Sequence, residues 1–212
     1  MNPRLEILIA THNPGKVIEV NEALRSLPLR LRYLSEFNVC SVDEVGRTYE
    51  ENAALKALSY AEQTGLCALA DDSGLEVNAL NGRPGVRSAR YGGDQATDVD
   101  RIRKLLSEIS QTEAAERNAR FVCCMALAGF QPSSEGGAET PHVLTVVEAA
   151  CAGSISAQPL GTNGFGFDPV FVPAGYDETF GELSNEVKAR ISHRAQALAG
   201  MREFLTRWLG QT

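Results

Sequence analysis

The chain has 212 residues, of which 43% are hydrophobic and 22% charged, a composition typical of a globular protein of one domain or two fused lobes. Its formal net charge of −7 argues against binding long nucleic acid through a basic face, although local cations could still hold a small anion. Apolar runs reach nowhere near the roughly 18 residues of a transmembrane helix, and the first residues lack a signal-peptide pattern. We therefore expect a cytoplasmic protein that does not associate with membranes.

The chain opens with the strand, loop and helix of an α/β protein. Leu5–Ala10 predicts a short apolar strand, and the polar loop Thr11–Lys16 leads from it into a helix over Lys16–Ser26. Leu29–Leu34 is a second candidate strand. This order predicts a sheet with helices on its faces.

A capping box marks the next helix. Thr48 is followed three positions later by Glu51, a spacing that opens a helix over Tyr49–Thr64, and Gly65 fits its C-terminal stop. The many alanines of this segment predict close packing of the helix on a sheet.

The stretch Leu69–Gly74, which reads LADDSG, places two adjacent carboxylates after an apolar run. Leu66–Ala70 predicts a short buried strand, at whose end Asp71 and Asp72 would leave the core. Two neighbouring anions repel, so the pair is costly unless a cation, hydrogen-bond donors or a proton compensates. Leu75–Leu80 would then form a separate return strand. The alternative is a plain turn with an aspartate cap.

The second half of the chain predicts further strands and helices of a single domain over residues 1–212. A weaker cap at Thr97 and Asp100 opens a helix over Val99–Ser110. Two strands, Phe121–Phe130 and Val143–Ile155, follow and are joined by a surface loop. The chain ends with a glycine-rich loop, Gly161–Asp168, and a helix over His193–Trp208 with Ser192 as a candidate cap. The five cysteines form no C-x-x-C pair, which predicts buried free thiols rather than disulfides or a zinc site.

The loop Thr11–Lys16, THNPGK, has the residue types of an anion site. Backbone amides at a helix N-terminus favour anions, Lys16 adds a positive charge, and Thr11 and Asn13 can donate hydrogen bonds. The spacing is not that of a Walker A loop. An ordinary capped turn is the alternative.

Glu44 and Asp72 offer hard oxygen ligands of the kind that suits magnesium. This ion usually takes one or two carboxylates and leaves its other positions to water and phosphate oxygens. The sequence does not show whether the two side chains meet, and Glu44 could instead be a solvated loop residue.

The segment Thr162–Phe171, TNGFGFDPVF, combines glycines with aromatic rings. The glycines allow a ligand to approach closely, and Phe165 and Phe167 offer flat faces on which a nucleobase can stack. A turn with two core phenylalanines is the alternative.

The segment Glu182–Leu198 contains Lys188, His193 and Arg194, three residues suited to an anionic or polar ligand. Lys188 can pair with phosphate. His193 and Arg194 begin the last helix, where the helix dipole disfavours positive charge, so their presence there points to a ligand or partner.

Six segments, in this order, resemble the inosine triphosphate pyrophosphatase family, also called Ham1-like: ATHNPGK, EVGRTYEENAALKA, ADDSGLEV, GRPGVRSARYGG, GFGFDPVF and ISHRAQAL. They span nearly the whole chain. The resemblance implies an elongated mixed β-sheet flanked by helices, with two lobes and a central cleft, assembled as a homodimer. It also implies Mg²⁺-dependent hydrolysis of noncanonical purine nucleotides (ITP, dITP and XTP) to the nucleoside monophosphate and pyrophosphate.

The resemblance further implies roles for individual residues. Asp72 would deprotonate the water that attacks the α-phosphorus, and Asp72 and Glu44 would bind the metal. Substrate would be bound by Thr11, His12, Asn13, Pro14, Gly15, Lys16, Ser73, Phe165, Gly166, Phe167, Asp168, Lys188, His193 and Arg194. His12, Phe167 and the long loop Gln131–His142 depart from the usual family pattern, and Asp71 is either a ligand or a structural acceptor.

Three other interpretations stay open at this point. The chain could be a related pyrophosphatase for other modified nucleotides, a non-catalytic sensor of purine nucleotides, or a purely structural homodimer. The presence of Asp72, Glu44 and two lysines, Lys16 and Lys188, argues against the sensor. The costly Asp71–Asp72 pair argues against the structural homodimer.

Overall fold

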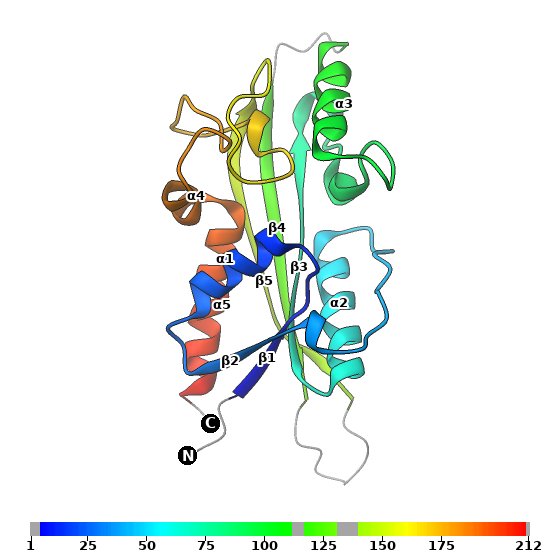
Figure 1. Ribbon diagram of the computed structural model, residues 1–212, viewed down its shortest axis with the longest axis vertical. Helices are drawn as coiled ribbons and strands as arrows, with labels where there is room; N and C mark the ends of the chain where they lie inside the picture. Colours follow the sequence, from blue (N-terminus) through cyan, green and yellow to red (C-terminus); the bar gives the residue numbers. More distant parts are fainter. Residues whose placement is uncertain (1–4, 112–116, 131–139, 211–212) are drawn as a thin grey trace. The chain divides into compact units, whose positions relative to one another are not determined.

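The structure, a computed structural model, describes residues 5–111, 117–130 and 140–210 (Figure 1). The helices are α1 (Pro14–Leu24), α2 (Tyr49–Thr64), α3 (Asp98–Ser110), α4 (Asn185–Ile191) and α5 (His193–Leu209). The strands are β1 (Leu5–Ile9), β2 (Leu29–Tyr33), β3 (Cys67–Val77), β4 (Asn118–Gly129), β5 (His142–Ile155) and β6 (Phe171–Pro173). Every helix among these described residues is too short or too polar to traverse a bilayer.

The described strands form one mixed sheet in the order β2-β1-β3-β4-β5-β6. β1 runs parallel to β2 and β3, with Ile7 opposite Leu31 on one side and Cys67 on the other. β6 runs antiparallel to β5, with Ser154 opposite Val172. Parallel neighbours require crossover connections, and α1 and α2 lie in the connections between β1, β2 and β3. The predicted α/β class with a mixed sheet is confirmed.

Contacts along the chain divide it into two compact units. Unit 1 comprises Met1–Asp72, Cys124–Glu148 and Ala197–Thr212. Unit 2 comprises Ser73–Cys123 and Ala149–Gln196. Each unit contains its own part of the residues that the sequence singles out, so the two are described separately below.

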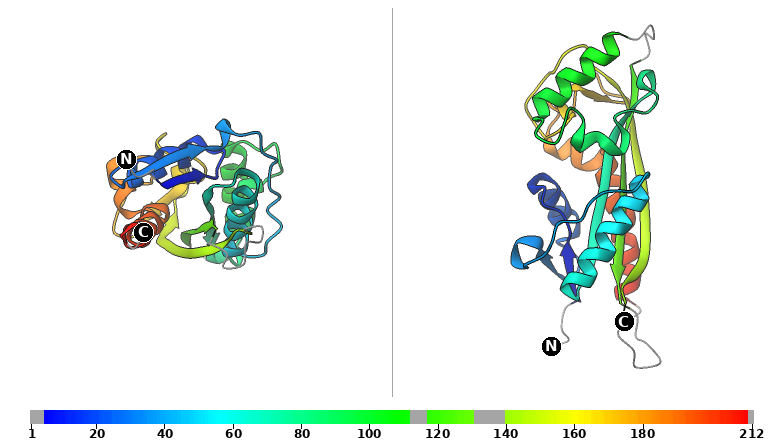
Figure 2. Two further views of the ribbon diagram at one scale, coloured as in Figure 1. Left: turned by 90° about the horizontal axis from the view of Figure 1, so that it is seen from below. Right: turned by 90° about the vertical axis from the view of Figure 1, so that its right-hand side faces the viewer.

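In the core of unit 1, helices approach strands through short side chains. Residues Ile7–Ile9 of β1 are buried, and Ala53 and Ala57 form part of a buried alanine face on α2, which packs against β3 (Figure 2). α5 lies against β5, where a Cβ on Gly200 would be 2.8 Å from Val147 Cγ1. Small residues therefore let both helices approach the strands closely, as the alanine pattern predicts for α2.

The core of unit 2 is aromatic. Phe121 lies 4.6 Å from Phe171 between ring centroids, and Phe171 lies 5.4 Å from Phe180. All three side chains are buried, and such packed rings contribute more than their buried area alone. The core also includes the apolar residues of α3, which recur every three to four positions: Ile102, Leu105 and Ile109.

The predicted strand end at Asp71 and Asp72 is wrong. β3 continues without interruption from Cys67 to Val77, so Leu75 belongs to the same strand rather than to a separate return strand. Asp71 and Asp72 are only 7% and 5% exposed. The strand tolerates two carboxylates at its centre because neighbouring elements supply cations and a hydrogen-bond donor to them, as described below.

The boundaries of α2 are predicted correctly, but its capping box is incomplete. Thr48 Oγ1 accepts the hydrogen bond from Glu51 N at 3.1 Å. The Glu51 carboxylate accepts from Arg47 N at 2.6 Å instead of from the Thr48 amide. Gly65 ends the helix in the left-handed region, at φ 69°, as expected for glycine.

The prediction of free thiols is confirmed for all five cysteines, although Cys40 is exposed and Cys67 half-buried. Burial raises the pKa of Cys124 to about 12 and that of Cys151 to about 11, so these thiols are protonated at neutral pH. Most of the predicted surface loop Gln131–His142 lies outside the described residues.

Candidate active site

The loop before α1 uses its polar side chains to cap the helix. Asn13 Oδ1 accepts hydrogen bonds from Gly15 N at 2.9 Å and Lys16 N at 3.3 Å, and Thr11 Oγ1 accepts from Asn13 N at 3.2 Å. Pro14 occupies the first turn, where its missing N–H costs nothing. Thr11 and Asn13 thus act as acceptors here, and an anion would reach the two capped amides only by displacing Asn13.

Lys16 and Asp71 form a buried ion pair within unit 1. Lys16 Nζ lies 2.8 Å from Asp71 Oδ2, and both side chains are largely shielded from water. This contact gives Asp71 a cationic partner, which explains how one of the two adjacent carboxylates of β3 is accommodated.

Glu44 and Asp72 meet at a lysine that the sequence analysis did not single out. Lys56 Nζ lies 2.5 Å from Glu44 Oε1 and 3.9 Å from Asp72 Oδ1. One turn earlier on α2, Asn52 Nδ2 donates a hydrogen bond to Asp72 Oδ2 at 2.9 Å. Because residues four apart share one face of a helix, α2 presents both groups to β3. Lys16, Glu44, Lys56, Asp71 and Asp72 are called the charged cluster below.

Asn52 also fixes the loop before α2. Its Oδ1 accepts from Gly46 N at 2.8 Å, and the residue is fully buried. A Cβ on Gly46 would be 2.6 Å from Asn52 Oδ1, so only glycine fits there without displacing the amide. The signal that could have identified Asn52 and Lys56 is a pair of polar residues, four apart, beside the alanine face of the helix.

The environment of the charged cluster raises the pKa of both Asp72 and Lys56. Burial raises the pKa of Asp72, and it outweighs the lowering by Lys56 and by the hydrogen bond from Asn52. Burial lowers the pKa of Lys56, but the charges of Asp71, Asp72 and Glu44 more than reverse this and leave that pKa above its ordinary value. The cluster therefore holds a charged lysine beside a carboxylate that is more basic than usual.

The charged cluster fits a divalent cation by its composition. The five residues of the cluster comprise three carboxylates and two ammonium groups. Within the described residues there is no group of three histidine, cysteine or acidic side chains arranged to hold a metal. Glu44 and Asp72 match the one or two carboxylates that magnesium takes when water and phosphate oxygens complete its coordination.

In unit 2, Asp168 organises the glycine-rich loop. Asp168 Oδ2 accepts a hydrogen bond from Phe165 N at 2.7 Å and lies 2.6 Å from Lys188 Nζ, in a buried ion pair. Gly164 has a φ of 74°, and a Cβ there would collide with the Asp168 carboxylate. Residues Gly161–Asp168 are called the glycine loop below.

Phe165 lies beneath two cations. Lys188 Nζ is 4.6 Å from the centre of its ring, and Arg194 Cζ is 5.6 Å away. Arg194 Nη2 donates a hydrogen bond to Ser73 Oγ at 2.9 Å. Unit 2 thus brings together five of the predicted substrate-binding residues: Ser73, Phe165, Asp168, Lys188 and Arg194.

Phe167 and His193 instead lie in the core of unit 2. Phe167 is 4% exposed, with its ring centre 6.3 Å from that of Tyr91. His193 is also 4% exposed and stacks on Phe121 at 4.6 Å between centroids and 12° between planes. Of the two phenylalanines, the structure therefore favours Phe165 as the ring that a ligand would meet.

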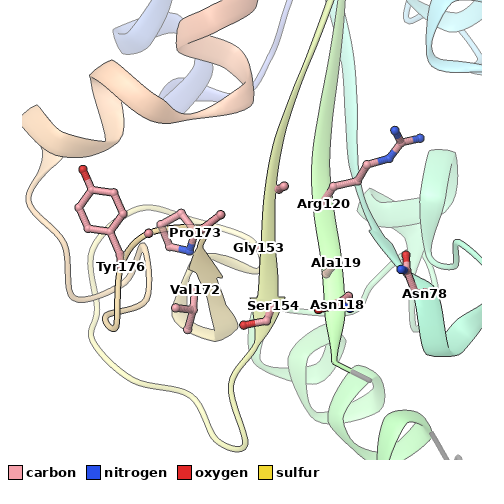
Figure 3. A pocket seen from close by; sticks show the side chains of 12 residues that line it. Asn78, Asn118, Ala119, Arg120, Gly153, Ser154, Val172, Pro173 and Tyr176 are labelled. Atoms are coloured by element: carbon pink, nitrogen blue, oxygen red, sulfur yellow. The ribbon is translucent and has the colours of Figure 1, made fainter. Parts of the chain in front are cut away.

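The other sequence-predicted residues occupy simpler positions. In unit 1, His12 is exposed and its ring lies edge-on to Tyr60 at 6.5 Å. In unit 2, Gly166 adopts a φ of 63°, which favours glycine. A surface pocket of about 540 Å³ in unit 2 contains none of the predicted site residues. It is lined by residues of β4, β5 and β6, by Asn78 and by residues 174–176 (Figure 3).

A family model and individual relatives both match this chain, and they point to the same family. Residues 7–204 match the model described as the Ham1 family. A relative from Coxiella burnetii named dITP/XTP pyrophosphatase is 41% identical over 95% of this chain and 97% of its own. One from Bacillus subtilis with the same name is 42% identical over 94% of this chain and 96% of its own.

Solved structures agree with these matches. The structure of a HAM1 protein from Coxiella burnetii superposes with a TM-score of 0.84, at 41% identity, over 96% of this chain and 99% of that one. A nucleoside-triphosphatase (dITP/XTP pyrophosphatase) from Mycobacterium abscessus gives a TM-score of 0.70 at 39% identity, over 95% of this chain and 100% of that one. Sequence motifs, fold and near-complete coverage coincide, and the chain belongs to the Ham1 family.

Proposed function

We propose that this protein hydrolyses ITP, dITP and XTP to the nucleoside monophosphate and pyrophosphate, with magnesium as its metal. The single observation that carries the proposal is the buried carboxylate of Asp72, whose pKa is raised and which lies beside Lys56 and Glu44. A perturbed carboxylate next to cations and a second carboxylate is typical of a catalytic site for a polyanionic substrate. Relatives named dITP/XTP pyrophosphatase support the choice of substrate.

Asp72 would act as the general base. As the water oxygen bonds to the α-phosphorus, Asp72 takes the water proton, the bond to the bridging oxygen breaks, and pyrophosphate leaves with that oxygen. Asn52 holds Asp72 Oδ2 in place, which orients the carboxylate for this step. General base catalysis of this kind contributes roughly 10²–10⁴-fold to the rate.

The cations of unit 1 would stabilise negative charge during the reaction. Lys16 and Lys56 lie against the carboxylates of the charged cluster, and their ammonium groups would also attract phosphate oxygens. Magnesium held by Glu44 and Asp72 would neutralise charge on the phosphates. Thr11–Lys16 would bind the triphosphate, with the exposed His12 at the same loop.

Unit 2 would recognise the nucleoside. The ring of Phe165 offers a stacking face, and Arg194 is a donor suited to the 6-oxo group of hypoxanthine and xanthine. Adenine carries a 6-amino donor at this position. It would leave such a donor without an acceptor, at a cost of about 1–3 kcal/mol for each lost partner.

We also propose that the protein is a cytoplasmic homodimer, as the family resemblance implies. A mass of twice the 22.8 kDa chain in light scattering would support the dimer, and a mass of one chain at working concentration would contradict it.

The test of the proposed reaction is a substrate panel in ¹⁸O-labelled water. We expect the magnesium-loaded protein to release pyrophosphate from ITP, dITP and XTP much faster than from ATP, with the label in the monophosphate. Label in the pyrophosphate would contradict attack at the α-phosphorus. Tight binding of ITP without hydrolysis would instead support the sensor, and faster turnover of other modified nucleotides would support the related pyrophosphatase.

A further inference from the structure

We propose that Asp98, which lies outside every segment with an assigned role, is a positioning residue for the glycine loop. The proposal rests on the proposed function, because it concerns the loop that would present Phe165 to the nucleobase. It adds α3 to the elements that determine substrate recognition.

The contact itself is a hydrogen bond between residues far apart in the chain. Asp98 Oδ2 accepts from Gly166 N at 2.8 Å, across 68 positions of sequence and within unit 2. Asp98 Oδ1 lies 2.6 Å from Arg101 Nη1, so one carboxylate joins the loop amide to an arginine one turn along α3. A charged acceptor makes this hydrogen bond stronger than one between neutral groups.

The loop needs such an anchor because the residues on both sides of Phe165 are glycines in the left-handed region. Gly164 has a φ of 74° and Gly166 a φ of 63°, and glycine loses more backbone freedom on ordering than any other residue. Phe165 lies between them. Its own amide is held by Asp168 from within the loop, and the next amide is held by Asp98 from α3. Two carboxylates thus fix the consecutive peptide groups on either side of the Phe165 Cα.

Asp98 is not required for the cap of α3, and this separates positioning from helix stability. The capping box is formed by Thr97 and Asp100, whose carboxylate accepts from Thr97 N at 3.1 Å while Thr97 Oγ1 accepts from Asp100 N at 3.2 Å. Asp100 also has its own arginine, Arg103, at 3.3 Å. Both aspartates lie in the first turn and pair with an arginine three positions on, but the hydrogen bond to the glycine loop comes from Asp98.

Asp98→Ala and Asp100→Ala are therefore matched variants. The first readout is hydrogen exchange of the Gly166 amide, measured by NMR without substrate. We expect Asp98→Ala to speed this exchange by about 10–100-fold, the range for losing a hydrogen bond to a charged group, and Asp100→Ala to leave it unchanged. Asp98→Asn keeps an oxygen acceptor and should restore much of the protection, which guards against a variant that merely unfolds.

The second readout is the kinetics of ITP hydrolysis. We expect Asp98→Ala to raise KM about tenfold or more with kcat changed far less, because the loop binds the base and not the reacting phosphate. Arg101→Ala removes the ion pair but retains the acceptor and should resemble Asp98→Asn.

Three results would overturn the proposal: equal effects of Asp98→Ala and Asp100→Ala on Gly166 exchange, faster exchange with an unchanged KM, or a fall in kcat alone. Failure of the wild-type protein to hydrolyse ITP would overturn the proposed function separately, since the exchange contrast between the two variants needs no substrate.

Discussion

The charged cluster of unit 1 and the glycine loop of unit 2 both bury carboxylates beside lysines, but the balance of charge differs. In the charged cluster, three carboxylates share two ammonium groups, and the pKa of Asp72 is raised. In the glycine loop, Asp168 and Lys188 form one ion pair at 2.6 Å. A cluster with more carboxylates than lysines contains a carboxylate of raised proton affinity and can attract a further cation, and both properties suit a catalytic step. A balanced pair fixes a backbone shape, which suits recognition.

The largest effect is expected from Asp72→Asn. Turnover of ITP should fall by about 10²–10⁴-fold because the proton acceptor is lost while the shape of the side chain is kept. Steady-state kinetics measures this, with Asp43→Asn, an exposed aspartate next to Glu44, as the control. Activity of Asp72→Asn near that of the control would refute the assignment of unit 1 to the chemical step.

The same variant tests the sign of the pKa shift. Because the folded state raises the pKa of Asp72, its stabilising contribution is present below the ordinary aspartate pKa and is lost as pH rises through the raised value. Asp72→Asn should therefore match or exceed the wild type in thermal stability at pH 7, with the difference vanishing in acid. A less stable variant at pH 7 would show that Asp72 is stabilised as an anion.

The next effect concerns stability rather than rate. Lys188→Met removes the partner of a buried carboxylate, which should cost about 3–5 kcal/mol in denaturant unfolding. Arg190→Met on the same helix, where the side chain is exposed, should change stability by no more than about 0.5 kcal/mol. Adding Asp168→Asn should recover part of the loss. Equal stability of the two single variants would mean that the balanced pair does not hold the loop.

Phe165→Leu should mainly weaken binding. Loss of a stacking ring costs roughly 1–3 kcal/mol per base, so KM for ITP should rise about 5–100-fold with little change in kcat. Phe204→Leu, at a ring that stacks near Trp208 on α5, is the matched control. A fall in kcat without a rise in KM would place Phe165 with the chemistry instead of with recognition.

Lys56→Met is expected to move a pH profile. Lys56 lowers the pKa of Asp72, so its removal raises that pKa further, and Asp72 must be ionised to accept a proton. The acid limb of kcat/KM should consequently shift to higher pH, whereas Lys104→Met, at an exposed lysine on α3, should leave it in place. An unshifted limb would mean that another group limits activity in acid.

Local signals in the sequence predict α1, α2, α3 and α5, but not the short helix α4. The bounds of α2 follow from a cap, a small-residue face and a terminal glycine, all of which act within a few residues. The length of β3, in contrast, depends on contacts with residues distant in the sequence. Charge after an apolar run indicates a strand end only if nothing compensates it. Here Lys16 pairs with Asp71, and Asn52 donates a hydrogen bond to Asp72.

The candidate site was predicted unevenly for a similar reason. Phe165 and Phe167 are equivalent in the sequence, yet Gly166, with a φ of 63°, turns the chain so that one ring lies beneath cations and the other packs in the core. The sequence does not distinguish Lys56, because a lysine on a helix is usually solvated. The roles of these residues in binding and catalysis stay predictions.

The bridge made by Asn52 has an evolutionary consequence. Its amide joins the Gly46 backbone to the Asp72 carboxylate, so the loop that carries Glu44 and the proposed base are adjusted by one side chain. Even a methyl group at Gly46 would press on that amide and disturb the Asp72 contact. Substitutions at Gly46 are thereby restrained, because they would change the proton affinity of Asp72, 26 positions further along the chain.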